Sequence, residues 1–226
     1  MTVHATLRPT RSARRTGWVP AALVALALIP AVAGSLRLVE IAGGPHLMPA
    51  NPRLTMSPVP VSVHIVSAIL YAVLGAFQFS ATLRRRHRLW HRRVGRVLVA
   101  LGLAVAGSAL WMTLFYARQP GTGELAYLFR LAFGAGMAAC IVLGLSTIRR
   151  GDVPAHLAWM TRAYALAMGA GSQTFTLGVG HALLGTSVLV TDLMLGAAWI
   201  INLAVAETVI RQPARRRRRT TAAVMA

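Results

Sequence analysis

Two short motifs contain the residues whose types and spacing could do chemistry. One is Trp90-His91-Arg92-Arg93-Val94-Gly95-Arg96; the other runs from Gly151-Asp152 through His156 to Trp159-Met160 and Arg162. Each motif lies where an arginine-rich loop meets a long apolar run. Imidazole and carboxylate groups are ligands for transition metals, and imidazole also ligates haem iron. We therefore expect His91, Asp152, His156 and Arg162 to meet at one surface.

Long apolar runs must position these residues. The chain has 226 residues, of which 56% are hydrophobic, and its mean hydropathy is +0.59. A helix of about 20 apolar residues crosses the roughly 30 Å hydrocarbon core of a bilayer. Six runs have that length: residues 18–36, 59–82, 97–117, 125–148, 157–180 and 188–210. The sequence thus predicts an all-α, polytopic transmembrane helical bundle of about six helices, forming one domain over residues 18–210.

Arginine placement predicts the orientation of this bundle. The net charge is +19 and the sequence contains no lysine. The segments that hold 19 of the 24 arginines are 1–17, 83–96, 149–156 and 211–226. Basic loops stay on the cytoplasmic side of a membrane, so both termini are expected to be cytoplasmic. The expected location is the plasma membrane. We expect the basic segment 1–17 and an irregular Arg-rich tail, 211–226, to face anionic lipid rather than nucleic acid.

The first apolar run has a second interpretation. Arg14-Arg15, the apolar stretch from Val19 and the Ala31-Val32-Ala33 triplet together have the pattern of a cleavable signal peptide. Cleavage would leave five helices in the same orientation. We favour an uncleaved helix.

Polar side chains within the predicted spans should face other helices or a cavity. The second span has one polar stripe: His64, Ser67, Tyr71, Gly75, Gln78 and Thr82. By depth, an external cluster should contain His64, Arg130, His181 and Asp192, with an Arg130–Asp192 ion pair. The cytoplasmic layer should contain Gln78, His91, Asp152, His156, Arg162 and Glu207. In the fifth span a face of small residues should permit close packing, and its glycines should permit a kink.

The same positions resemble a known family. The residues that carry the resemblance are His64, Gly75, Gln78-Phe79, His91-Arg92, Gly95-Arg96, Gly151-Asp152, His156, Trp159-Met160 and Arg162. Over roughly residues 60–210 they are similar to the multi-pass membrane family called domain of unknown function 2306. The resemblance implies a transmembrane helical bundle and no established reaction. Relatives often carry a further arginine where this chain reads Ser172-Gln173-Thr174-Phe175, which puts an anion site there in doubt.

Three functions fit these residues. A non-catalytic structural or regulatory bundle needs only the packing role of the polar groups. A haem b electron carrier, with a quinone or protein redox partner, would use His64 with His181 and His91 with His156 as two ligand layers, and arginines such as Arg92 would pair with propionates. A transporter of a small molecule, proton or ion would use the intramembrane charges.

Enzymatic chemistry has weaker support. His91, His156 and Asp152 form a set that a metal would accept, but no His-x-x-x-His helix motif supports it, so no metal site is predicted. The chain has no Gly-x-Ser-x-Gly nucleophile elbow, and Cys140 lies alone in an apolar run. Any redox role would therefore be electron transfer of the membrane oxidoreductase type.

Overall fold

Hydrophobic helices of membrane-spanning length make up most of the molecule. The computed structural model describes residues 18–52 and 57–225. Among these residues five helices are long and apolar enough to cross a membrane. They are α2 (Val19–Ile41), α4 (Pro58–Gln78), α6 (Arg88–Phe115), α7 (Glu124–Arg149) and the Val188–Gln212 part of α10 (Val188–Met225). The all-helical, multi-pass prediction is confirmed for this part of the chain, whereas the predicted basic segment 1–17 lies outside it.

The predicted span 157–180 is divided into two shorter helices. α8 (Val153–Ala167) and α9 (Gly169–Leu184) meet at Met168, whose ψ of 1° takes it out of the helical conformation. The last carbonyls of a helix have no N–H donor within the helix. In a membrane, other groups of the protein must donate hydrogen bonds to these carbonyls. Here α10 does so: Trp199 Nε1 donates to the Leu166 carbonyl at 3.2 Å, and Asn202 Nδ2 donates to that of Ala165 at 3.1 Å.

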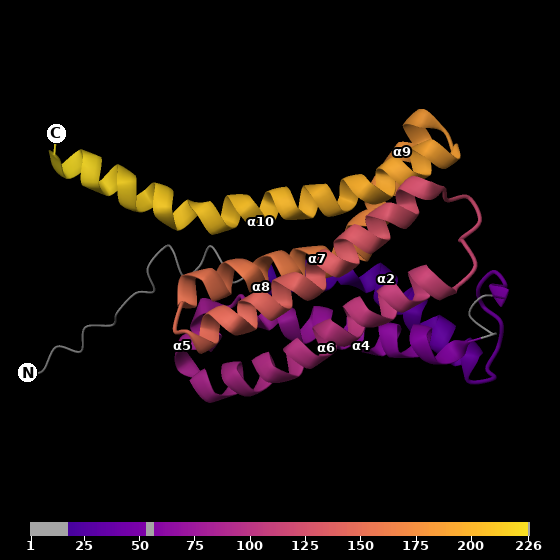
Figure 1. Cartoon of the computed structure of the whole chain (residues 1–226), viewed down its shortest axis with the longest axis horizontal. Helices are drawn as coiled ribbons and strands as arrows, with labels where there is room; N and C mark the ends of the chain where they lie inside the picture. The colour runs from indigo at the N-terminus through magenta and orange to yellow at the C-terminus, as the bar shows by residue number, and fades with distance from the viewer. Residues whose placement is uncertain (1–17, 53–56, 226) are drawn as a thin grey trace, which may run out of the picture.

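The helices run back and forth between two ends of the bundle (Figure 1). α4 packs on α6, α6 on α7, α7 on α8 and α9 on α10, while α2 contacts α4 and α9. We call one end the arginine-rich end; it contains α5 (Ala81–Arg86), the start of α6 and the turn between α7 and α8. The opposite end, the loop end, contains residues 42–52, 116–123 and 185–187.

Several boundaries differ from those predicted. α4 ends at Gln78, so Thr82 falls in α5 rather than on the predicted stripe. α6 begins at Arg88, so the Trp90–Arg96 motif forms its first turns instead of a loop. α10 continues as helix to Met225, where an irregular tail was expected. Arginine is a good helix former, so a helix can continue through an arginine-rich segment. A prediction based on hydropathy alone ends the helix where the apolar run ends.

Two tyrosines fill the core between α4, α6, α7 and α8. The rings of Tyr71 and Tyr164 lie 5.8 Å apart, and Tyr164 donates to the Ala72 carbonyl at 2.7 Å. Gly75 makes room for the second ring, since a Cβ there would lie 2.4 Å from Tyr164 Cε2. Close helix packing through small residues is the usual solution in membranes, where lipid offers no hydrophobic drive for helix association.

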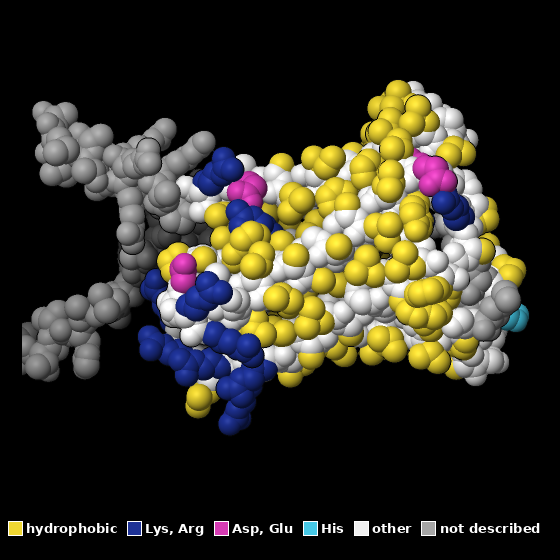
Figure 2. Space-filling model, in the orientation of Figure 1, with side chains coloured by type: hydrophobic (Ala, Val, Ile, Leu, Met, Phe, Trp, Pro, Cys, Tyr) yellow, Lys and Arg dark blue, Asp and Glu magenta, His cyan; other side chains and the backbone are white. Residues whose placement is uncertain are grey.

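The surface separates into an apolar belt and a charged end. Hydrophobic side chains cover the middle of the bundle, and dark blue arginines gather at the arginine-rich end (Figure 2). The belt includes large apolar side chains that are half exposed or more, such as Leu28, Val142 and Ile200. Lipid would cover this belt, because a soluble monomer rarely exposes contiguous apolar patches of such extent.

Candidate functional site

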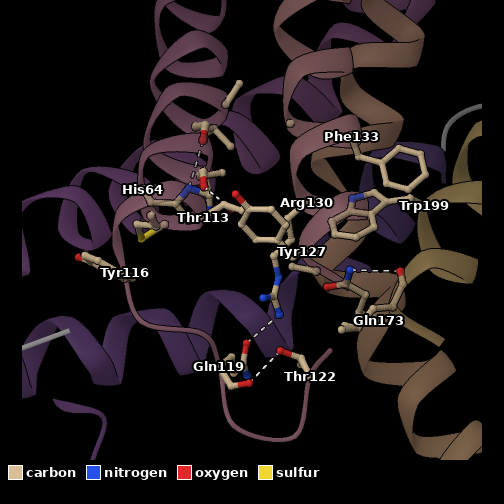
Figure 3. Close-up of a pocket in the computed structure, with 18 of the residues that line it drawn as sticks. His64, Thr113, Tyr116, Gln119, Thr122, Tyr127, Arg130, Phe133, Gln173 and Trp199 are labelled. Atoms are coloured by element: carbon tan, nitrogen blue, oxygen red, sulfur yellow. Dashed lines mark hydrogen bonds between the residues drawn. The ribbon is translucent and has the colours of Figure 1, made fainter. Parts of the chain in front are cut away.

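A cavity of about 620 Å³ opens at the loop end, among α4, α6, α7, α9 and α10. Its apolar wall includes Val105, Met137 and Leu177, with the rings of Phe133 and Trp199 along one side (Figure 3). These two rings lie 4.9 Å apart and are inclined by 32°. Cavities of this size with mainly apolar walls and few polar groups are typical of small-molecule sites.

His64 is fixed to the wall of the cavity by α6. Its Nδ1 lies 3.2 Å from the Val105 carbonyl and 3.1 Å from Ser108 Oγ. A histidine held at Nδ1 by a backbone carbonyl presents Nε2 in a fixed direction, an arrangement shared by many ligand-binding histidines. The prediction that His64 faces the interior of the bundle agrees with this position.

Arg130 projects from α7 toward the loop that precedes this helix (Figure 3). Its guanidinium donates to Gln119 Oε1 at 2.9 Å, and both residues line the cavity together with Tyr127. The buried Asp192 carboxylate, which was predicted to pair with Arg130, accepts from the Gly123 N–H at 2.9 and 3.1 Å. Asp192 thus anchors on α10 the same loop that carries Gln119.

The predicted external cluster is therefore only partly assembled. His64 and Arg130 line the cavity, but His181 and Asp192 are not among the described residues that line it. His181 Nε2 instead lies 3.0 Å from Thr191 Oγ1, across the α9–α10 corner. This arrangement gives no support to a haem held between His64 and His181.

At the arginine-rich end the residues that were predicted to meet have separate contacts. Asp152 caps α8, since its Oδ1 accepts from the Ala155 N–H at 3.0 Å. Arg162 Nε donates to Glu207 at 2.5 Å and lies 4.8 Å over the Trp159 ring. The described residues contain no cluster of three or more His, Cys, Asp or Glu side chains that could hold a metal ion. Among the described residues Asp152 therefore does not join His91 and His156 in such a cluster, and Arg162 contacts Glu207 and Trp159.

The two histidines of this end do lie near each other. His91 on α6 and His156 on α8 are close enough to interact electrostatically. His156 Nδ1 lies 2.8 Å from the Gly144 carbonyl of α7, so α7 fixes its ring. Arg92, the neighbour of His91, is exposed, as expected for an arginine that contacts lipid phosphate.

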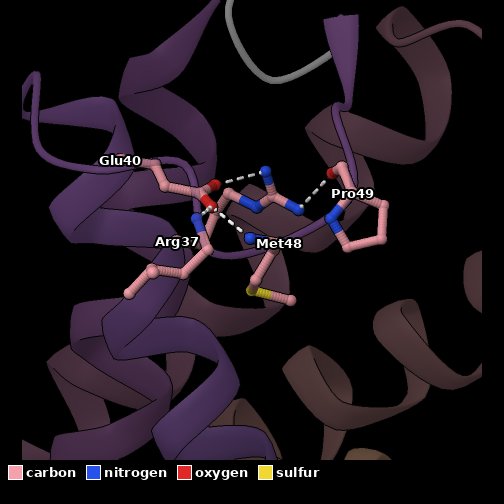
Figure 4. A network of polar contacts seen from close by, with 5 residues as sticks. Arg37, Glu40, Met48 and Pro49 are labelled. Carbon is pink, nitrogen blue, oxygen red and sulfur yellow. Dashed lines mark hydrogen bonds and ion pairs between the residues drawn. The ribbon is translucent and has the colours of Figure 1, made fainter.

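Some polar residues of the loop end were missed by sequence reasoning. α2 extends to Ile41, beyond the predicted limit of 36, and carries a buried Glu40 that pairs with Arg37 at 2.6 Å (Figure 4). Glu40 also accepts from the Leu47 and Met48 N–H groups. The i,i+3 spacing of Arg37 and Glu40 was the available signal. Gln119 and Gln173 of the cavity show no comparable spacing pattern, because Arg130 and Leu195, with which their side chains form hydrogen bonds, are more than ten residues away in the sequence.

The Arg162–Glu207 pair gives the first prediction. Replacing either residue by alanine should lower the free energy of unfolding in detergent by about 1 kcal/mol, since the pair is partly exposed and salt screens it. A double-mutant cycle followed by thermal unfolding measures the coupling. Additive losses in the Arg162→Ala/Glu207→Ala protein would contradict a direct interaction.

The fold and the cavity together define a class: a polytopic helical membrane protein with a ligand-sized chamber at one end. The model of the family described as predicted membrane protein (DUF2306) matches residues 61–210. The chain therefore belongs to this family, and the resemblance seen in the sequence is confirmed. No curated protein and no solved structure matches the chain.

Proposed function

We propose that this protein is a non-catalytic membrane receptor that binds a small organic acid with an apolar body in the loop-end cavity. The observation that carries the proposal is the charge of the lining. Arg118, Arg130 and His64 line a chamber whose wall is mainly apolar and aromatic, and the described lining residues include no carboxylate. Arg118 pairs with Glu124, which is not among the lining residues. A cationic ligand would find no counter-charge among these lining side chains, whereas an acid would find one in Arg130.

The chemistry of Arg130 supports an acidic ligand. One nitrogen of its guanidinium, Nη2, donates to a neutral amide oxygen, that of Gln119. A guanidinium forms a shorter and stronger hydrogen bond with a carboxylate or phosphate oxygen than with an amide oxygen. A carboxylate or phosphate group can also accept two parallel bonds from one guanidinium. An acid would therefore compete well for this donor, and the Phe133–Trp199 wall would cover its apolar body.

The charge pattern supports a location for the site. Arginines gather at the end of the bundle opposite the cavity. Under the positive-inside rule that end faces the cytoplasm of the plasma membrane, so the cavity would open to the external side.

Transport of the same ligand is a second candidate. The junction of α8 and α9 borders the cavity, since Ala167 and Ala170 on either side of Met168 line it. Interrupted helices beside a central site are common in secondary transporters, where they allow one half of a helix to move.

A thermal-unfolding screen in neutral detergent tests the binding proposal. The probes are benzoate, octanoate and phenyl phosphate, each paired with a neutral analogue such as benzamide or octanamide. We expect at least one acid to raise the Tm and its neutral analogue to do so less. Arg130→Gln should weaken the affinity for that acid roughly ten- to a hundredfold, as loss of a charge-assisted bond implies.

Arg96→Gln is the matched control, because Arg96 is exposed on α6 at the other end of the bundle. It removes the same charge and should leave the affinity unchanged. Equal stabilisation by acids and amides, or an unchanged affinity in Arg130→Gln, would overturn the proposal. Uptake of the bound acid into proteoliposomes would then distinguish a carrier from a receptor.

A further inference from the structure

A second polar site lies at the arginine-rich end, in residues that the proposed function does not use. The side-chain Nε2 and Oε1 of Gln78 and the Nδ1 of His91 are buried, and none of them has a hydrogen-bond partner among the described residues. Nearly all buried polar groups in proteins are hydrogen-bonded, so three such atoms at one end of a bundle require an explanation.

Topology brings these atoms to one level of the bundle. Gln78 is the last residue of α4 and His91 lies in the first turn of α6, and the short helix α5 connects the two. His91 is also close enough to interact electrostatically with Arg84 of α5 and with His156 of α8. Gln78, His91, His156 and Arg84 thus come from four helices that converge at this end.

The chemistry of this group indicates a particular kind of ligand. A cation would be repelled by Arg84 and by the exposed arginines around it, Arg85, Arg86, Arg88 and Arg92. An anion would be attracted to them. The amide of Gln78 needs one partner that accepts and one that donates, because it has both a free N–H₂ and a free oxygen. A ligand that contains both a phosphate and hydroxyl groups meets all of these requirements.

We propose that Gln78, His91, His156 and Arg84 bind the headgroup of an anionic phospholipid that carries a polyol, such as phosphatidylglycerol. The phosphate oxygens would accept from the partly exposed Arg84 and from an imidazole N–H. The Gln78 amide is closed off from solvent in this structure, so the neighbouring side chains would move aside for its Nε2 to donate to the phosphate and its Oε1 to accept from a headgroup hydroxyl. The site lies where α4 ends and the arginines begin, which is the level at which lipid headgroups meet a membrane protein.

Native mass spectrometry in neutral detergent tests this assignment. Wild-type protein should retain phosphatidylglycerol in preference to phosphatidylcholine. The preference should fall at least tenfold in Gln78→Leu and His91→Phe. His87→Phe is the matched control, because His87 is exposed immediately before α6 among the same arginines and should bind as wild type does. Soluble glycerol 1-phosphate, added as a competitor, distinguishes a site for the free headgroup from one that requires the lipid tails.

Thermal stability separates a ligand site from a packing role. An amide without a partner costs stability, so Gln78→Leu should raise the Tm of lipid-free protein and abolish the further rise that phosphatidylglycerol causes. Gln173→Leu is the contrast, since Gln173 Nε2 already donates to the Leu195 carbonyl at 3.3 Å; it should lower the Tm and keep the lipid effect.

Three results would overturn the inference. The first is equal retention of the two lipids by wild-type protein, and the second is an unchanged preference in both Gln78→Leu and His91→Phe. The third is a Soret band in the purified protein that disappears in His91→Phe, because the two histidines would then hold haem instead.

Discussion

Replacing Gly171 by leucine should separate α2 from α9 and strongly destabilise the protein. A Cβ at Gly171 would lie 2.4 Å from the backbone oxygen of Leu26, on α2. A side chain can rotate away from such a clash, but a backbone oxygen moves only with its helix. Overpacking of a closed interface typically costs about 1–3 kcal/mol, and here the clash involves a whole helix.

Gly178→Leu is the matched control for this prediction. Gly178 lies on the same helix, two turns further on, and a Cβ there would meet no atom within 4 Å. Both substitutions add the same helix propensity, so the difference in Tm between them reports the α2–α9 contact alone. Equal Tm values for the two variants in detergent would show that this contact is absent.

Replacing Asp192 by alanine should destabilise the loop end and weaken binding in the cavity together. Asp192 is 2% exposed and accepts both of its bonds from the Gly123 N–H. Its removal leaves that amide without a partner, and losing a bond to a charged group costs about 2 kcal/mol. The loop that carries Gln119 would also lose its attachment to α10, so Arg130 would no longer be held in place.

Asp192→Asn separates the acceptor from the charge, because the amide oxygen still accepts from Gly123. It should keep more of the stability than Asp192→Ala, as measured by chemical unfolding in detergent. Asp152→Ala is a useful comparison, since Asp152 is an exposed helix cap whose loss should cost about 1 kcal/mol without any effect on the cavity. If Asp192→Ala unfolds as wild type does, Asp192 has no anchoring role.

The sequence predicted the helices better than their ends. A run of apolar residues gives the length and the depth of a span, and five of the six predicted spans are single helices of spanning length. The remaining one is interrupted at Met168 because side chains of α10, Trp199 and Asn202, bond the carbonyls where α8 ends. The glycines of this span, Gly169 among them, predicted a kink, and α9 begins at Gly169. The bonding partners on α10 are more than 30 residues away in the sequence, so no local pattern identifies them.

The site was predicted only in part for a related reason. Depth in the membrane follows from position along a run, but the direction in which a side chain points depends on how each helix is rotated against its neighbours. His64 and Arg130 were assigned correctly to one end of the bundle, whereas His181 shares their depth and faces Thr191 instead. Asp152 was read as a possible ligand, although its position before Val153-Pro154 is equally that of a helix cap.

One indole links the cavity to the interrupted helix. Trp199 forms part of the aromatic wall, and its N–H is bonded to the carbonyl of Leu166 near the end of α8. α8 also carries His156 and Arg162, which lie toward the opposite end of the bundle. A molecule that displaces this ring on entering the chamber would therefore disturb the same helix that reaches the arginine-rich end. A single side chain thus connects the two ends of the bundle.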